Sequence, residues 1–300
     1  MINNDECREL ITGSFPELEI YSFSILGKGK SGIICLVNNE IVFKIPLQTK
    51  GEKAEWQKTE AEVLRFLENR MDKASQVNKI SFEIPKILYT ATAESGHFII
   101  GETLLSGIPL TYELYDTFSE DIKAGILRQL GSIARCLHDS GGHDSSWMSN
   151  NYRESLDVYL NEFNDRFSGK VRSVFSSREI NKIEETARYY ETLYNEHTAR
   201  PVLCHHDLHL ANLMIDLDSK KITGLLDFGC AGYSEPARDW HYYFDTSEVL
   251  TGYGDNGDAY LKDRILFHAL SWLLNCLGEE IENDEKPYRS LEYIRDYVIK

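Results

Sequence analysis

A predicted β-hairpin joins two polar segments in the last third of the chain. The first polar segment runs from Cys204 to Asn212, and the second is Asp227-Phe228-Gly229. Between them, residues 213–217 and 221–226 alternate in polarity on either side of a turn at residues 218–220, which is the pattern of two antiparallel strands. The chain must therefore fold so that both polar segments lie at the open end of one hairpin.

The register of this hairpin predicts a cation site. If Leu217 pairs with Lys221, then Asn212 lies opposite Leu226 and beside Asp227. Amide and carboxylate oxygens, completed by phosphate oxygens and water, suit the octahedral coordination that Mg²⁺ prefers. We therefore predict that Asn212 and Asp227 bind Mg²⁺.

Three histidines in the first polar segment leave a zinc site as an alternative. They are His205, His206 and His209. Zinc sites usually also contain an H-E-x-x-H motif or paired cysteines, and neither occurs here, so zinc is the less favoured interpretation. His205 is expected to order the loop through a hydrogen bond to backbone near the Asp227 segment. The role of His209, near a phosphate or in solvent, and that of His206 stay open.

The spacing of His205, Asp207 and Asn212 is H-x-D-x-x-x-x-N, and D-F-G follows shortly after it. Enzymes that transfer a phosphoryl group from a nucleoside triphosphate use this combination. Its first Asp orients or deprotonates the attacking hydroxyl, while the Asn and the second Asp hold metal. We therefore predict that Asp207 is the catalytic residue, against the alternative of a chance hairpin with polar ends.

A glycine-rich run in the first third of the chain fits the same chemistry. It matches G-x-G-x-x-G between predicted strands at residues 20–26 and 33–37, and it comprises Gly27, Lys28, Gly29, Lys30, Ser31 and Gly32. A dinucleotide-binding interpretation fails because no helix follows Gly32, and a Walker A loop fails because Ser24 occupies a required glycine position. A strand–loop–strand that covers nucleotide phosphates remains, with donors from Gly27, Gly29, Ser31 and Gly32.

Lys44 and Glu60 are predicted to form an ion pair. Lys44 lies within the apolar strand at residues 40–46, where a charged side chain needs a partner unless it faces solvent from an edge strand. In a predicted helix at residues 52–70, Glu60 shares the inward face with Trp56, Val63, Leu64 and Leu67. The spacing predicts that Lys44 binds the α- and β-phosphates and that Glu60 holds it in place.

The remaining pattern predicts an α+β fold with two lobes. Further strands are expected at residues 87–91 and 97–102, and helices at 119–138, 151–167 and 177–197. Residues 1–105 are therefore expected to form a small antiparallel-sheet lobe that binds nucleotide. Its last segment would offer backbone groups of Glu102 and Leu104 to a purine. Residues 106–300 are expected to form a larger, mostly helical lobe that holds the catalytic loop and the acceptor.

The charge of the chain is strongly negative and argues against nucleic-acid and membrane partners. The formal net charge is −16, and residues 106–300 carry 33 acids against 20 bases. Such a surface repels phosphate-rich polymers and anionic lipids. It is either a solvated surface or one that collects a cationic substrate. The six cysteines are scattered without paired spacing, and neither a signal peptide nor a long apolar run is apparent, so a cytoplasmic protein with reduced thiols is expected.

Taken in order along the chain, these motifs resemble the aminoglycoside phosphotransferase family, whose fold is like that of protein kinases. The resemblance covers residues 27–32, 41–46, the helix with Glu60, 106–110, Leu137-His138, 204–216, 224–229, Glu235-Pro236 and Asp239. It implies the same roles for Lys44, Glu60, Asp207, Asn212 and Asp227, and it implies that Asp239 braces the catalytic loop. His206 departs from the glycine that is commonest at its position in the family.

The resemblance leaves the substrate open. An aminoglycoside O-kinase is the leading hypothesis, with ATP or GTP as donor. Kinases of macrolides, choline, homoserine or similar metabolites would share the same motifs, and a nucleotide-binding pseudokinase is disfavoured because the motif residues are present. Aminoglycosides are polycations, so carboxylates and an aromatic ring are expected at the acceptor site. Asp245 and Glu248, expected on one helix face, and Trp272 are the candidates.

Overall fold

The computed structural model describes residues 3–29, 32–68, 70–71, 80–141, 155–243 and 246–299. The chain forms two compact units, each built from two stretches of sequence. Unit 1 consists of residues 1–129 and 209–231, and unit 2 consists of residues 130–208 and 232–300. Among the described residues, no helix is both long and apolar enough to cross a membrane.

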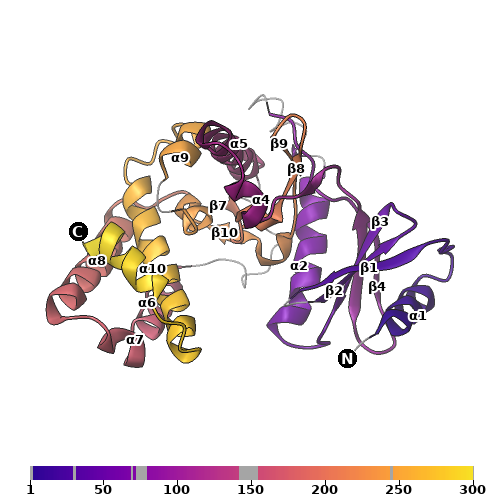
Figure 1. Cartoon of the computed structure of the whole chain (residues 1–300), viewed down its shortest axis with the longest axis horizontal. Helices are drawn as coiled ribbons and strands as arrows, with labels where there is room; N and C mark the ends of the chain where they lie inside the picture. The colour runs from indigo at the N-terminus through magenta and orange to yellow at the C-terminus, as the bar shows by residue number, and fades with distance from the viewer. Residues whose placement is uncertain are drawn as a thin grey trace. The chain divides into compact units, whose positions relative to one another are not determined.

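Unit 1 contains an antiparallel five-stranded sheet with the order β1-β2-β3-β5-β4 (Figure 1). Its strands are β1 (Phe23–Lys28), β2 (Gly32–Val37), β3 (Ile41–Pro46), β4 (Ile87–Thr92) and β5 (Phe98–Thr103). The turn between β2 and β3 uses Asn38 and Asn39, both with positive φ, which is the two-residue turn that suits the twist of a hairpin. The five predicted strands are present within a few residues of their expected ends.

The two faces of this sheet are covered by different helices. Alternation along β3 sends Phe43 and Ile45 to a core shared with helix α1 (Asn4–Ser14), whereas Lys44 points to helix α2 (Glu52–Leu67). Figure 1 shows α1 and α2 on opposite sides of the sheet. The sequence analysis did not predict α1. Its signal was the capping box, in which Asn3 and Glu6 satisfy each other's backbone N–H groups.

A second, three-stranded sheet explains why unit 1 extends beyond residue 105. Strand β6 (Ile108–Pro109) pairs with β8 (Leu213–Asp216), which pairs with β9 (Lys221–Leu225). Glu83 adds two backbone hydrogen bonds to β9, of 2.8 and 3.0 Å. Helix α4 (Tyr112–Asp116) and the first half of α5 (Glu120–Asp139) also belong to unit 1. The division therefore differs from the predicted boundary at residue 105, because the hairpin is hydrogen-bonded to chain on both sides of that point.

The β8–β9 hairpin keeps the predicted register at its open end and loses it at its turn. Leu213 lies opposite Leu225, and the Leu226 N–H donates to the Asn212 carbonyl at 2.8 Å. A bulge after Met214 then shifts the pairing, so that Asp216, and not Leu217, lies opposite Lys221. The Asp216 side chain accepts from the Ser219 N–H and hydroxyl at 2.7 Å, which closes the turn one residue earlier than predicted.

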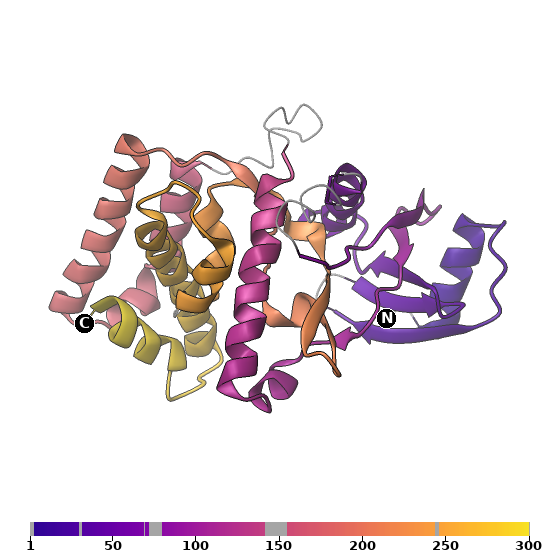
Figure 2. The same cartoon turned by 90° about the horizontal axis from the view of Figure 1, so that it is seen from above.

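Unit 2 is mainly helical, and its core surrounds helix α10 (Leu261–Glu282), which is seen in gold in Figure 2. Its other helices are α6 (Leu156–Arg166), α7 (Gly169–Ser173), α8 (Ser177–Glu196), α9 (Ser247–Tyr253), α11 (Arg289–Ile294) and the second half of α5. Phe267 of α10 stacks on Tyr190 of α8 at 3.8 Å between ring centroids. A short ladder pairs β7 (Val202–Cys204) with β10 (Gly232–Ser234), which fixes the two ends of the catalytic loop region.

Gly131 allows helices α5 and α9 to touch through their backbones. A Cβ atom added at Gly131 would overlap the Val249 carbonyl oxygen and lie 2.7 Å from the Tyr253 amide nitrogen. We therefore expect Gly131→Ala to lower the free energy of unfolding by about 2 kcal/mol, since backbone cannot move aside as a side chain can. Gly125→Ala, on the same helix with open space around the added carbon, should raise it by about 0.5 kcal/mol. Equal effects of both substitutions in thermal unfolding would contradict this account.

Candidate active site

Lys44 is held between two buried carboxylates in unit 1. Its Nζ lies 2.7 Å from Glu60 Oε1 and 3.0 Å from Glu102 Oε1, and both glutamate side chains are only 2% exposed. The Glu60 contact is the one that helical spacing predicted. The Glu102 contact was not predicted: the sequence analysis assigned only backbone groups of Glu102 to a ligand. Its side chain reaches Lys44 because Glu102 lies opposite Val42, so that it faces the same side of the sheet as Lys44.

This cluster contains more acidic side chains than basic ones. Burial by itself lowers the pKa of Lys44, but Glu102, Glu60 and Asp227 outweigh burial and raise it above its usual value. Burial raises the pKa of both the Glu60 and Glu102 carboxyls, while Lys44 opposes that shift. Within the described residues, Glu102 Oε2 is buried without a hydrogen-bond partner. The cluster therefore keeps Lys44 charged and would gain from a nearby cation.

Glu60 also ties helix α2 to the D-F-G segment. Glu60 Oε1 accepts a hydrogen bond from the Phe228 N–H at 3.1 Å, in addition to its contact with Lys44. Phe228 begins the short 3-10 helix η3 (Phe228–Cys230), and Gly229 lies so close to Trp56 of α2 that an added Cβ would be 3.1 Å from the Trp56 Cβ. One buried carboxylate therefore fixes both Lys44 and the residue that follows Asp227.

Asn212 and Asp227 lie at the open end of the hairpin, as its register requires. The bond between the Leu226 N–H and the Asn212 carbonyl sets them on adjacent strand ends. Asn212 is buried, and Asp227 is exposed in a left-handed conformation with φ of 64°. An amide oxygen and a carboxylate are hard oxygen donors of the kind that Mg²⁺ prefers. The two residues therefore fit a Mg²⁺ ion.

The glycines in the β1–β2 turn differ in what the surrounding structure requires of them. The Gly29 N–H donates to the Gly32 carbonyl at 2.8 Å, which closes the turn. A Cβ at Gly32 would lie 2.5 Å from the Ile45 carbonyl oxygen, so packing against β3 requires this glycine. No described atom lies within 4 Å of a Cβ added at Gly27. Ser31, which was predicted to donate to phosphate, lies outside the described residues.

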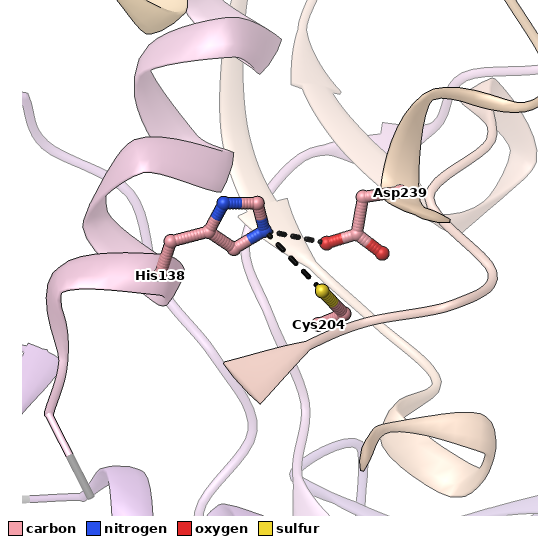
Figure 3. A group of neighbouring side chains, drawn as sticks. All are labelled: His138, Cys204 and Asp239. Atoms are coloured by element: carbon pink, nitrogen blue, oxygen red, sulfur yellow. Dashed lines mark hydrogen bonds and ion pairs between the residues drawn. The ribbon is translucent and has the colours of Figure 1, made fainter. Parts of the chain in front are cut away.

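In unit 2, the buried carboxylate of Asp239 braces the loop that carries Asp207. Its two oxygens accept from the backbone N–H groups of His205 at 3.0 Å and His206 at 2.7 Å. His138 Nε2 lies 2.9 Å from Asp239 Oδ2 and 3.8 Å from Cys204 Sγ, as Figure 3 shows. These three side chains are metal-ligand types, but the Asp239 oxygens are already engaged by backbone amides. The group therefore matches the bracing role that the family resemblance implied.

The backbone of this loop is strained at His206. Its φ of 65° lies in the left-handed region, which explains why glycine is favoured at this position. The His206 side chain offsets part of this cost, because its Nε2 lies 2.6 Å from the Ser234 hydroxyl. Beside it, the Asp207 N–H donates to His205 Nδ1 at 3.3 Å. This contact orders the loop from within, whereas the predicted contact of His205 was with backbone near Asp227.

The buried carboxylate of Asp239 should make the free energy of unfolding depend on pH in the acidic range. Burial raises the pKa of Asp239, but His138, His206 and His205 together lower it to about 2. A depressed pKa contributes stability above the unfolded value, roughly 4, and this contribution is lost as pH falls through about 2. We expect Asp239→Asn to cost about 3 kcal/mol in chemical unfolding at pH 7, with a smaller difference from wild type at pH 3. Asp218→Asn, at the exposed hairpin turn, should show neither effect.

Asp207 contacts a tyrosine that the sequence analysis missed. The Tyr242 hydroxyl donates to Asp207 Oδ1 at 2.6 Å, and the Tyr242 ring meets Trp272 edge-on at 5.1 Å. The structure therefore connects Trp272, a predicted acceptor residue, to Asp207. No local sequence pattern indicates Tyr242, because the contact depends on the chain returning to Asp207 after Asp239.

Of the two predicted acceptor carboxylates, Glu248 lies within the described residues and Asp245 does not. Glu248 lies half-buried in the first turn of α9, which begins at Ser247. Asp245 precedes the Thr246 N-cap and lies outside the described residues. The expectation that Asp245 and Glu248 share a helix face therefore stays a prediction.

The chain is similar to known proteins in sequence and in fold. A sequence model described as "Phosphotransferase enzyme family" matches residues 35–264. The GDP complex of wild-type aminoglycoside 2'-phosphotransferase-IIIa is similar to the chain with a TM-score of 0.77 and 20% identity, over 98% of each chain. The streptomycin–ATP–APH(2")-IIa ternary complex gives 0.70 and 19%, over 100% of this chain and 98% of that one. Macrolide 2'-phosphotransferase MphH from Brachybacterium faecium gives 0.65 and 16%, over 96% and 97%. These likenesses show a kinase-like fold.

Proposed function

The chain belongs to the phosphotransferase enzyme family, and we propose that it is a Mg²⁺-dependent kinase that phosphorylates a hydroxyl of an aminoglycoside. The observation that carries this proposal is the double contact of Glu60, which binds both Lys44 and the Phe228 N–H. This contact links the lysine proposed to bind phosphates to the segment that presents Asp227 to a metal. Binding of a nucleoside triphosphate requires both groups to be in place.

Unit 1 residues would bind the donor nucleotide. Lys44 would bind the α- and β-phosphates, while Gly27, Gly29, Ser31 and Gly32 would present backbone and hydroxyl donors to them. Backbone groups of Glu102 and Leu104 would contact the purine. Asn212 and Asp227 would hold Mg²⁺, which when bound neutralises charge on the β- and γ-phosphate oxygens. Either ATP or GTP fits this description.

Asp207 would act on the acceptor. The acceptor oxygen forms a bond to the γ-phosphorus as the bond from that phosphorus to the β–γ bridging oxygen breaks, and the nucleoside diphosphate leaves. The hydroxyl proton passes to the Asp207 carboxylate and then to solvent. Asp239 keeps Asp207 in place through the amides of His205 and His206.

The acceptor class rests on charge and on one aromatic contact. Residues 106–300 carry 13 more acids than bases, which favours a polycationic acceptor over a neutral one. Trp272 contacts the ring of Tyr242, whose hydroxyl bonds to Asp207. Trp272 would stack on a sugar ring, while Asp245 and Glu248 would bind ammonium groups. Solved relatives bind kanamycin, gentamicin or streptomycin, which supports the same class here.

The cytoplasm is the proposed location of this reaction. The six cysteines, all within the described residues, form no disulfide bonds and four of them are buried, which suits a reducing compartment that also supplies nucleoside triphosphates.

The experiment that tests this function measures phosphate transfer from ATP and GTP to a panel of aminoglycosides, macrolides and small amino-alcohols. We expect aminoglycosides to be phosphorylated, and we expect their KM to rise with added salt because screening weakens charge attraction. A neutral control acceptor should show no such salt dependence. An enzyme that ignores aminoglycosides and phosphorylates a neutral alcohol would establish a metabolic kinase. Nucleotide binding without transfer to any acceptor would favour a pseudokinase.

A further inference from the structure

The phenol of Tyr242 makes the same kind of bond to Asp207 that an acceptor hydroxyl must make. Its hydroxyl donates to Asp207 Oδ1 at 2.6 Å, which is a short distance typical of an O–H bonded to a carboxylate. Both residues are partly buried, so the contact lies near the surface of unit 2 and not deep in its core. It is therefore available to a molecule that approaches Asp207.

The Tyr242 ring is fixed by its neighbours. Trp272 packs edge-on against it at 5.1 Å with an interplanar angle of 75°, and His241 lies 3.9 Å away between ring centroids. His241 is itself buried and bonds through Nδ1 to the Arg238 carbonyl at 2.7 Å. A ring held on two sides points its hydroxyl in one direction, so the bond to Asp207 loses little side-chain entropy.

We propose that Tyr242 is a positioning residue for Asp207, an inference that rests on the proposed phosphotransfer function. By bonding to Oδ1, the hydroxyl holds the Asp207 carboxylate in one orientation toward the acceptor. Asp239 orients the backbone of this loop through two amides, whereas Tyr242 orients the reacting side chain itself. Asp239 therefore acts on the backbone before Asp207, and Tyr242 acts on the Asp207 side chain. Loss of Tyr242 should disturb the orientation of the carboxylate without unfolding the loop.

Tyr242→Phe is the test, because it removes only the hydroxyl and keeps the ring on Trp272. We expect kcat to fall about 10-fold, while KM for nucleotide and for acceptor stays within about two-fold, the pattern of a contact that matters only in the transition state. Tyr243→Phe is the matched control. It removes an identical hydroxyl one residue away, which donates to the Leu208 carbonyl at 3.0 Å. Its kcat should stay within about two-fold of wild type.

The same substitution in an Asp207→Ala background separates positioning from general stability. If Tyr242 acts through Asp207, Tyr242→Phe should lower the residual rate by less than two-fold there. A 10-fold loss in that background, an equal loss from Tyr243→Phe, or no loss in the single variant would overturn the proposal.

Slow hydrolysis of the nucleotide without acceptor gives a second readout, because water then takes the place of the hydroxyl and its proton also passes to Asp207. Tyr242→Phe should lower this rate about 10-fold as well. If wild type hydrolyses nucleotide but phosphorylates no aminoglycoside, the proposed acceptor class fails, and the hydrolysis ratio still decides the role of Tyr242. An unchanged hydrolysis rate in Tyr242→Phe would count against that role.

Discussion

Asp207→Ala should lower turnover by a factor on the order of 10² to 10⁴, the usual contribution of a positioned acid–base group. The nucleotide KM should stay within about two-fold of wild type, because the residues proposed to bind phosphates belong to unit 1 and Asp207 belongs to unit 2. Steady-state kinetics with saturating acceptor and varied nucleotide would measure both quantities.

A folding control accompanies this prediction. Asp207 is partly buried; its side chain contacts Tyr242, and its N–H donates to His205. Alanine removes only the first of these, so the midpoint of thermal unfolding should change little. Turnover near the wild-type level in a folded Asp207→Ala protein would remove Asp207 from the reaction and leave the family resemblance without its central residue.

The parts of the site that the sequence predicted correctly are those encoded within one element. Helical periodicity alone placed Glu60 on the inward face of α2, and the contact with Lys44 followed from it. Strand alternation placed Asn212 and Asp227 at the open end of one hairpin. The bulge after Met214 made the predicted turn wrong by one residue, but it lies on the far side of the pairs that position the two ligands.

The missed contacts depend on pairings between distant segments. Glu102 faces Lys44 only because β5 pairs with β3 in one register, and β4 comes between them in sequence. A shift of that register by one residue would turn Glu102 to the opposite face. Tyr242 meets Asp207 only after β10 pairs with β7, which returns the chain to the catalytic loop. Neither register can be derived from local periodicity.

The limits of the compact units differ from the predicted boundary at residue 105 for a related reason. The sequence analysis placed the boundary where strand patterns give way to helical ones. The compact units instead follow hydrogen bonds that the β8–β9 hairpin makes to β6 and to Glu83. A two-residue strand such as β6 has no periodicity of its own, so composition shifts cannot reveal that it belongs with residues 209–231.

Asp227→Asn should impair catalysis nearly as much as loss of Asp207, but through the metal. The exchange keeps the size of the side chain and suits the left-handed backbone, whose φ of 64° would disfavour alanine. It removes one negative charge from the proposed Mg²⁺ ligands. We expect kcat/KM to fall by about 10² to 10³, because a metal ion contributes several kcal/mol of charge stabilisation to phosphoryl transfer.

The dependence on Mg²⁺ distinguishes this loss from that of a catalytic base. In Asp227→Asn, the Mg²⁺ concentration for half-maximal rate should rise at least about 10-fold, and excess Mg²⁺ should restore part of the activity. Asp207→Ala should show neither change. Asp218→Asn removes an exposed carboxylate at the other end of the same hairpin and should behave as wild type. Mg²⁺ titrations that overlay for wild type and Asp227→Asn would mean that the hairpin brings Asn212 and Asp227 together for a purpose other than holding metal.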